Sequence, residues 1–167
     1  MNKALILVDL QNEWLNKNSE YYLKELPISK INTLIDFCRD KSYKIIFIKH
    51  LELNGEYFKE GTKNAEIISK IKKKDTDTLI TKNKISPFYK TDLDKELKSI
   101  DEIIVCGALT NLCVRSLIQD AYDRDFKITV IRDCCKTMNE KTQEFTLKDL
   151  KETREEIQII ELEDLSE

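Results

Sequence analysis

The chain has 167 residues, of which 41% are hydrophobic and 35% charged, and this composition predicts one folded domain over residues 1–167. No apolar run reaches the roughly 18–20 residues that span a bilayer, and the N-terminus lacks a signal-peptide pattern, so we expect a cytoplasmic protein outside the membrane. The net charge is −3 and no basic cluster is interleaved with aromatic residues, which disfavours nucleic acid as a partner.

Short, β-rich apolar runs recur along the chain. A continuous run such as Ala4-Leu5-Ile6-Leu7-Val8 is typical of a strand that is buried on both faces. Six runs of this kind predict six strands, over residues 4–8, 44–48, 78–80, 103–106, 128–131 and 157–160.

Helical patterns alternate with these runs. Residues 29–39 carry an apolar stripe at helical spacing, with Ser29 as the expected N-cap. Further helices are predicted over residues 64–73, 93–97, 113–122 and 141–151. The alternation predicts an α/β fold with a parallel sheet and helices on both faces. The long polar segments 11–27 and 51–63 are candidate lid or interface loops.

Three reactive side chains fall at the expected carboxyl edge of the sheet, where ligands bind in open parallel sheets. Asp9 follows the first strand, Lys82 follows the third, and Cys113 opens the helix after the fourth. Taken singly, each has an ordinary explanation: an Asp capping a loop, a Lys on the surface, a Cys that packs. Their joint placement favours a chemical site.

Cysteine and histidine usage narrows the chemistry. There are five cysteines and one histidine, without a CxxC pair, which argues against a disulfide framework and a structural zinc site. A helix N-terminus lowers the pKa of a thiol, so we expect Cys113 to be reactive. The other four cysteines are expected mainly to pack: Cys38, Cys106, Cys134 and Cys135.

Several other site types are excluded by their motifs. Neither GxGxxG nor GxxxxGK[ST] occurs, so no dinucleotide or P-loop site is indicated. His50 follows the second strand and is the sole imidazole; a packing or loop role is favoured over a Cys-His pair.

Three segments resemble the isochorismatase-like cysteine hydrolase family. The segments run in order along most of the chain: Leu7-Val8-Asp9-Leu10-Gln11-Asn12-Glu13-Trp14, then Lys82-Asn83-Lys84-Ile85-Ser86-Pro87-Phe88, then Gly107-Ala108-Leu109-Thr110-Asn111-Leu112-Cys113-Val114. The resemblance implies a Rossmann-like three-layer αβα sandwich with a six-stranded parallel sheet.

The same resemblance implies a catalytic triad of Asp9, Lys82 and Cys113. In this scheme Asp9 takes the thiol proton, and the thiolate attacks an amide carbonyl to form a thioester. The backbone N–H groups of Leu109 and Cys113 form the oxyanion hole, beside a cis peptide at Ala108–Leu109. No cofactor is implied.

Departures from the family pattern bear on the substrate. Metal-dependent nicotinamidases carry Asp-x-His after the second strand, whereas this chain has Lys49-His50-Leu51-Glu52, so we expect no metal. Cys113 favours a small amide substrate. Gln11, Trp14 and Phe88 are candidate pocket residues, with ordinary core packing as the alternative. A homo-oligomer is expected. A non-amide hydrolase and a catalytically idle scaffold protein stay open.

Overall fold

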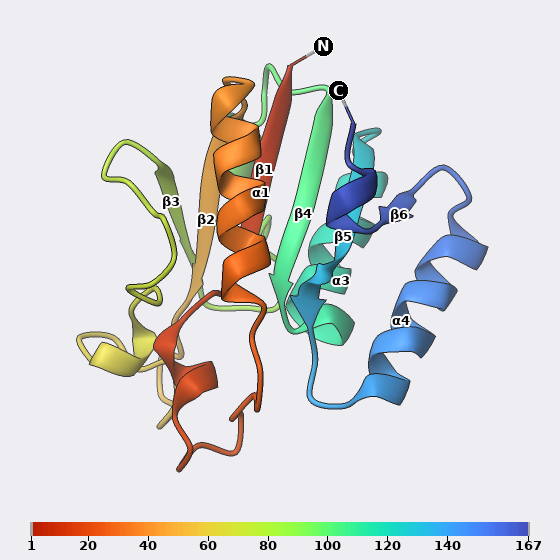
Figure 1. Cartoon of the computed structure of the whole chain (residues 1–167). Coiled ribbons are helices and arrows are strands. Elements are labelled where there is room, and N and C mark those ends of the chain that lie inside the picture. Colours follow the sequence, from red (N-terminus) through yellow and green to blue (C-terminus); the bar gives the residue numbers. More distant parts are fainter. Residues whose placement is uncertain (1, 167) are drawn as a thin grey trace.

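A six-stranded sheet organises the molecule, and every strand pair in it is parallel (Figure 1). The computed structural model describes residues 2–166. The spatial order of the strands is β3-β2-β1-β4-β5-β6. Their bounds are β1 Lys3–Val8, β2 Lys44–His50, β3 Thr78–Lys82, β4 Glu102–Ala108, β5 Lys127–Lys136 and β6 Gln158–Ile160. The α/β fold and the six predicted strands are therefore confirmed.

The central strands form the core because their side chains are apolar on both faces. Residues 4–8 of β1 and 103–108 of β4 are buried without interruption. β5 extends beyond its expected end and includes Cys134 and Cys135, which are buried in the same core as Cys38 and Cys106. These four thiols pack among aliphatic side chains, as their positions in the sequence predict.

Helices lie on both faces of the sheet. They are α1 Ile28–Asp40, α2 Leu93–Glu96, α3 Arg115–Tyr122 and α4 Glu140–Thr153. α1 leads from β1 to β2, whereas α3 leads from β4 to β5 in the opposite direction across the sheet, so right-handed crossovers place them on opposite faces (Figure 1). Within residues 2–166, no helix has the length and apolarity needed to cross a bilayer.

The predicted helix over residues 64–73 is wrong. Only a short 3₁₀ turn, Lys63–Ala65, forms there. Ile67 then bridges Gln11, and the chain turns again, with the Ile71 N–H donating to Ile68 at 2.9 Å. The backbone N–H of Ile68 donates to Leu10, and Lys72 pairs with the Asn32 side chain of α1. Since the backbone of this segment bonds to neighbouring elements, it buries its isoleucines without needing a helix.

Helix α1 begins before the expected cap. Ser29 lies inside the helix, and the N-cap position is Pro27, which forms no side-chain cap bond. α4, in contrast, has a side-chain cap, because Asn139 accepts a hydrogen bond from the Thr142 N–H at 2.9 Å. The α4 cap was not anticipated from the sequence.

Gly107 lets β4 approach β1 closely just before the site. Its φ is +128°, and a Cβ built there would lie 2.2 Å from the carbonyl oxygen of Val8. No side chain fits in that space, so glycine is required for the pairing of Val8 with Gly107. This close approach brings the ends of β1 and β4 together.

The two long segments between strands and helices gather at the carboxyl edge of the sheet, at the bottom of Figure 1. A second small apolar cluster joins them, separate from the main core. It consists of Trp14, Leu23, Phe58, Ala108 and Leu109. The cluster therefore connects both loops to the end of β4.

Candidate active site

Asp9 stands where β1 leaves the sheet. Its φ is +51°, a left-handed conformation that Asp tolerates better than most residues, and its N–H still donates to Ile48 at 3.0 Å. The residue is only 1% exposed. The turn thus directs a carboxylate into the interior at the edge of the sheet.

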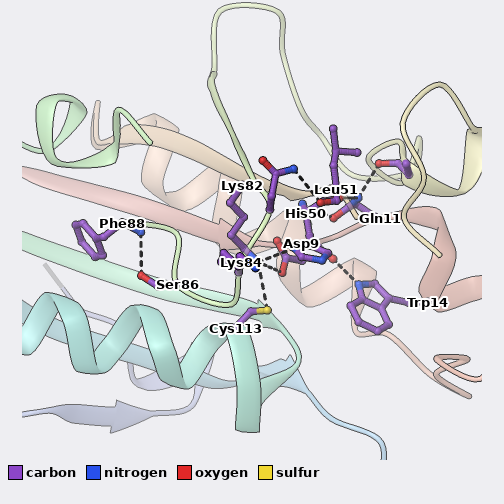
Figure 2. A network of polar contacts seen from close by, with 12 residues as sticks. Asp9, Gln11, Trp14, His50, Leu51, Lys82, Lys84, Ser86, Phe88 and Cys113 are labelled. Atoms are coloured by element: carbon purple, nitrogen blue, oxygen red, sulfur yellow. Dashed lines mark hydrogen bonds and ion pairs between the residues drawn. The ribbon is translucent and has the colours of Figure 1, made fainter. Parts of the chain in front are cut away.

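Lys82 ends β3 and is among the largest fully buried side chains of the described residues. Its Nζ lies 2.9 Å from Asp9 Oδ2 and 3.3 Å from Cys113 Sγ. It also donates to the Lys84 carbonyl at 3.1 Å. The Lys84 side chain is exposed, so Lys82 is the lysine that enters the site. Figure 2 shows Asp9, Lys82 and Cys113 pointing toward one another.

Cys113 lies in a π-helical turn, Thr110–Val114, which follows the cis peptide Ala108–Leu109 and precedes α3. Such turns are frequent at functional sites. Cys113 is half-buried, whereas the other four cysteines are buried. It is thus the most accessible thiol of the chain.

The expectation of a depressed thiol pKa is wrong for this structure. Burial and, to a lesser extent, the negative charge of Asp9 raise the pKa of Cys113 to about 12, against the opposing charge of Lys82. Cys113 also lies inside the π turn rather than at the start of a regular helix, so the effect of burial on the thiol pKa outweighs that of a helix dipole. The resting thiol is therefore protonated.

One oxygen of Asp9 is left without a partner. Oδ2 contacts Lys82, whereas Oδ1 is buried and has no hydrogen-bond partner among residues 2–166. A buried acceptor of this kind is costly unless it is used. Because the charge of Asp9 acts on the Cys113 thiol, this carboxylate is a candidate acceptor for its proton.

The side chain of Gln11 forms hydrogen bonds to backbone groups and does not line an open pocket. Its Nε2 donates to the carbonyls of His50 at 2.8 Å and Ala65 at 2.7 Å, and its Oε1 accepts from the His50 N–H at 2.8 Å. The side chain is fully buried. The structure therefore places Gln11 as a support for the end of β2.

The two candidate aromatic residues lie in different surroundings. The indole N–H of Trp14 donates to the carbonyl oxygen of Asp9, which places Trp14 beside the site. Phe88 is a member of the main core and packs its ring under the Arg124 guanidinium. Figure 2 shows Phe88 well apart from Cys113, so the expectation that it walls the site is not met.

Sequence reasoning missed the aromatic neighbours of Trp14. The centroid of the Phe58 ring lies 4.9 Å from that of Trp14 and 5.5 Å from that of His50. Tyr21 and Tyr57, whose rings contact each other, extend the group. Phe58 has a φ of +49°, which is rare for a bulky residue. Aromatic residues in both long polar segments were the available signal.

The sequence favours a packing or loop role for His50, but the residue borders the site. It ends β2 opposite Lys82, and its Nδ1 lies 3.3 Å from Lys82 Nζ. Burial and the charge of Lys82 lower the pKa of the imidazole, while Asp9 opposes them. Among residues 2–166, no group of three or more His, Cys, Asp or Glu side chains is arranged to hold a metal ion.

Comparisons with known proteins show what this chain is similar to. The family model described as the isochorismatase domain matches residues 3–161. Nicotinamidase 3 of Arabidopsis thaliana is 31% identical over 88% of this chain and 79% of its own length. The uncharacterised isochorismatase family protein YaaI of Bacillus subtilis is 31% identical over 87% of each chain.

Solved structures show the same fold. An isochorismatase family protein from Desulfovibrio vulgaris superimposes with a TM-score of 0.90, at 20% identity, over 97% of this chain and 95% of that one. The two proteins thus share the same fold.

Proposed function

This chain belongs to the isochorismatase family, and from that premise we propose that it is a cysteine-dependent hydrolase of a C–N bond in a small amide. One observation carries the proposal: Lys82 Nζ contacts both Asp9 and Cys113, so an acid, a base and a thiol from three segments meet in one buried cluster. The relative named as a nicotinamidase supports amide hydrolysis as the reaction class.

In the first step Asp9 removes the proton of the Cys113 thiol as the sulfur attacks the amide carbonyl carbon. The unpartnered Oδ1 of Asp9 is the acceptor for that proton. An S–C bond forms, and the carbonyl electron pair moves onto oxygen. Because the resting thiol is protonated, proton removal accompanies attack instead of preceding it.

The oxyanion would be held by the backbone N–H groups of Leu109 and Cys113, at the start and inside of the π turn. Preorganised donors of this kind are each worth about 10²–10³ in rate. When the tetrahedral intermediate collapses, the C–N bond breaks and Asp9 returns its proton to the leaving nitrogen. A thioester remains on Cys113.

Water completes the cycle. Asp9 takes a proton from a water molecule as the water oxygen attacks the thioester carbon. The C–S bond then breaks, and Asp9 returns the proton to the sulfur as the carboxylic acid leaves. Throughout, the ammonium of Lys82 stays beside Asp9 and offsets the negative charge that develops on the sulfur. Trp14 holds the Asp9 carbonyl and fixes the turn.

The test is a panel of small amides and ureido compounds, with isochorismate included, assayed with the wild type, Cys113→Ala and Cys113→Ser. We expect amide hydrolysis by the wild type and a loss of at least about 10³-fold in the alanine variant, because the nucleophile is gone. Quenched reactions should show, by mass spectrometry, an acyl group on the peptide that contains Cys113.

Three outcomes would contradict the proposal. Activity that survives in Cys113→Ala removes the nucleophile, and cleavage of isochorismate alone assigns the chain to non-amide hydrolysis. Binding of the amides without any turnover by the folded wild type identifies a catalytically idle member of the family.

A further inference from the structure

The two ring nitrogens of His50 face different surroundings. Nδ1 is 3.3 Å from Lys82 Nζ, whereas Nε2 has no hydrogen-bond partner within residues 2–166. Nε2 is also absent from the fully buried unpartnered atoms of that range, so this nitrogen is not completely enclosed by the protein. His50 is half-buried, at the border of the site.

The location of the ring proton follows from Lys82. An ammonium has only hydrogen atoms to donate, so Nδ1 must act as the acceptor, and a neutral imidazole then carries its hydrogen on Nε2. The charged groups around the ring are Lys82 on β3 and Asp9 after β1, with the Cys113 thiol next to Lys82. An imidazolium would instead direct an N–H at the ammonium.

The position of this N–H is fixed from several sides. The Gln11 side-chain amide bonds both the backbone N–H and the backbone carbonyl of His50. The backbone N–H of the next residue, Leu51, donates to the Lys82 carbonyl at 2.9 Å. The imidazole and the Phe58 ring pack in a T-shaped arrangement, with 5.5 Å between their centroids. A donor held this firmly loses little entropy when it binds a ligand.

We infer that His50 is a substrate-binding residue whose Nε2–H donates a hydrogen bond to a second acceptor atom of the substrate. The acceptor is a ring nitrogen, a carbonyl oxygen or a carboxylate oxygen. It belongs to a different group of the substrate from the amide that Cys113 attacks. This inference rests on the proposed function and names its substrate class. Amides that carry such an acceptor are preferred over isosteres that lack one, since the isostere leaves the N–H unpaired.

The first test needs no turnover. The chain contains a single histidine, so a tag-free protein labelled with ¹⁵N-histidine gives the ring nitrogen signals of His50 alone. We expect the neutral Nε2–H form at neutral pH in long-range ¹H–¹⁵N spectra. An Nδ1–H form or an imidazolium at that pH would overturn the inference.

The second test scans the acceptor around a ring. The kcat/KM of pyridine-2-, pyridine-3- and pyridine-4-carboxamide is compared with that of benzamide, and that of succinamate with that of butyramide. For at least one pair we expect a wild-type preference of about three- to tenfold for the acceptor, as one hydrogen bond supplies. His50→Phe should bring that ratio close to one, whereas His50→Gln, which keeps an N–H donor, should retain part of it.

The outcomes separate this inference from the proposed function. If His50→Phe lowers kcat/KM equally for both members of every pair, His50 only supports Lys82 and the inference is wrong. If the wild type hydrolyses none of the compounds, the proposed function fails at this panel. The ¹⁵N signals then decide: acceptor compounds should shift Nε2 while benzamide does not, and an equal or absent shift contradicts the role of His50.

Discussion

At the scale of single residues, the pKa of Cys113 determines how the site operates. Burial and Asp9 favour the thiol over the thiolate, and Lys82 compensates only in part. The family motif predicts Cys113 as the nucleophile, but it carries no information on how deeply the sulfur is buried. The structure therefore favours general-base activation by Asp9 over a thiolate formed in advance.

Alkylation measures this directly. Since the pKa of Cys113 is raised to about 12, its thiolate fraction grows with pH throughout the accessible range. We expect the rate of iodoacetamide labelling to rise about tenfold for each pH unit above neutrality. Asp9→Asn removes the negative charge that raises the pKa, so this variant should react faster at pH near 7.

Mass spectrometry of the peptide that contains Cys113 reports the labelling rate. The four buried cysteines provide an internal reference for unfolding: Cys38, Cys106, Cys134 and Cys135. A labelling rate that is independent of pH, or slower labelling of Asp9→Asn, would contradict the protonated resting thiol.

The Asp9–Lys82 pair also matters for stability. Both side chains are essentially inaccessible, with 1% and 0% exposure, so neither charge is solvated when its partner is removed. Lys82→Met should lower the free energy of unfolding by about 3–5 kcal/mol, because the Asp9 carboxylate is left alone in the interior. Urea denaturation followed by circular dichroism measures this change.

Two further variants show whether the unpaired charge is the cause. Asp9→Asn combined with Lys82→Met should be more stable than Lys82→Met alone, because the carboxylate has been neutralised. The Lys148–Glu152 pair on α4 is 71% and 64% exposed, so Lys148→Met should leave the denaturation midpoint nearly unchanged. A double variant that is less stable than the single one would refute the argument.

At the scale of secondary-structure elements, the strands were predictable and one helix was not. Runs such as residues 4–8 are apolar at every position, which only a strand buried on both faces requires. Ile67, Ile68 and Ile71 fit a helical stripe equally well in the sequence. In the structure the Ile68 N–H donates to Leu10, and the carbonyl of Lys70 accepts from the Asn32 side chain on α1. Local spacing does not reveal such distant partners.

The pairing of β1 with β4 depends on one glycine. In Gly107→Ala the new methyl group would meet the Val8 carbonyl oxygen at 2.2 Å, and a backbone atom in a central strand has no room to withdraw. Together with the positive φ, this should cost at least about 3 kcal/mol of stability. Hydrolysis should fall as well, because Asp9 follows Val8 directly.

Gly61→Ala is the matched control. Gly61 also has a positive φ, +78°, but nothing lies within 4 Å of the added atom. The free energy of unfolding of Gly61→Ala should fall by about 1–2 kcal/mol, because of the backbone conformation alone. Equal unfolding midpoints for the two variants would show that close approach is not the reason for Gly107.

At the scale of the whole molecule, the edge of the sheet explains which part of the site was foreseeable. Asp9, Lys82 and Cys113 follow strands whose carboxyl ends meet, so topology and motif together predict their convergence. His50 and Phe58 escaped prediction because they matter only once two long segments fold against each other. The T-shaped contact between the His50 and Phe58 rings leaves no periodic pattern in the sequence that could predict it.

Gln11 has a consequence for the architecture as a whole. By bonding both the N–H and the carbonyl of His50, a side-chain amide takes the place that the next peptide of β1 would occupy. The main chain can therefore leave the sheet two residues early while the neighbouring strand still finds its full set of partners. A change in the length of the segment 11–27 that keeps Gln11 and Trp14 in place should therefore leave the position of Asp9 unchanged.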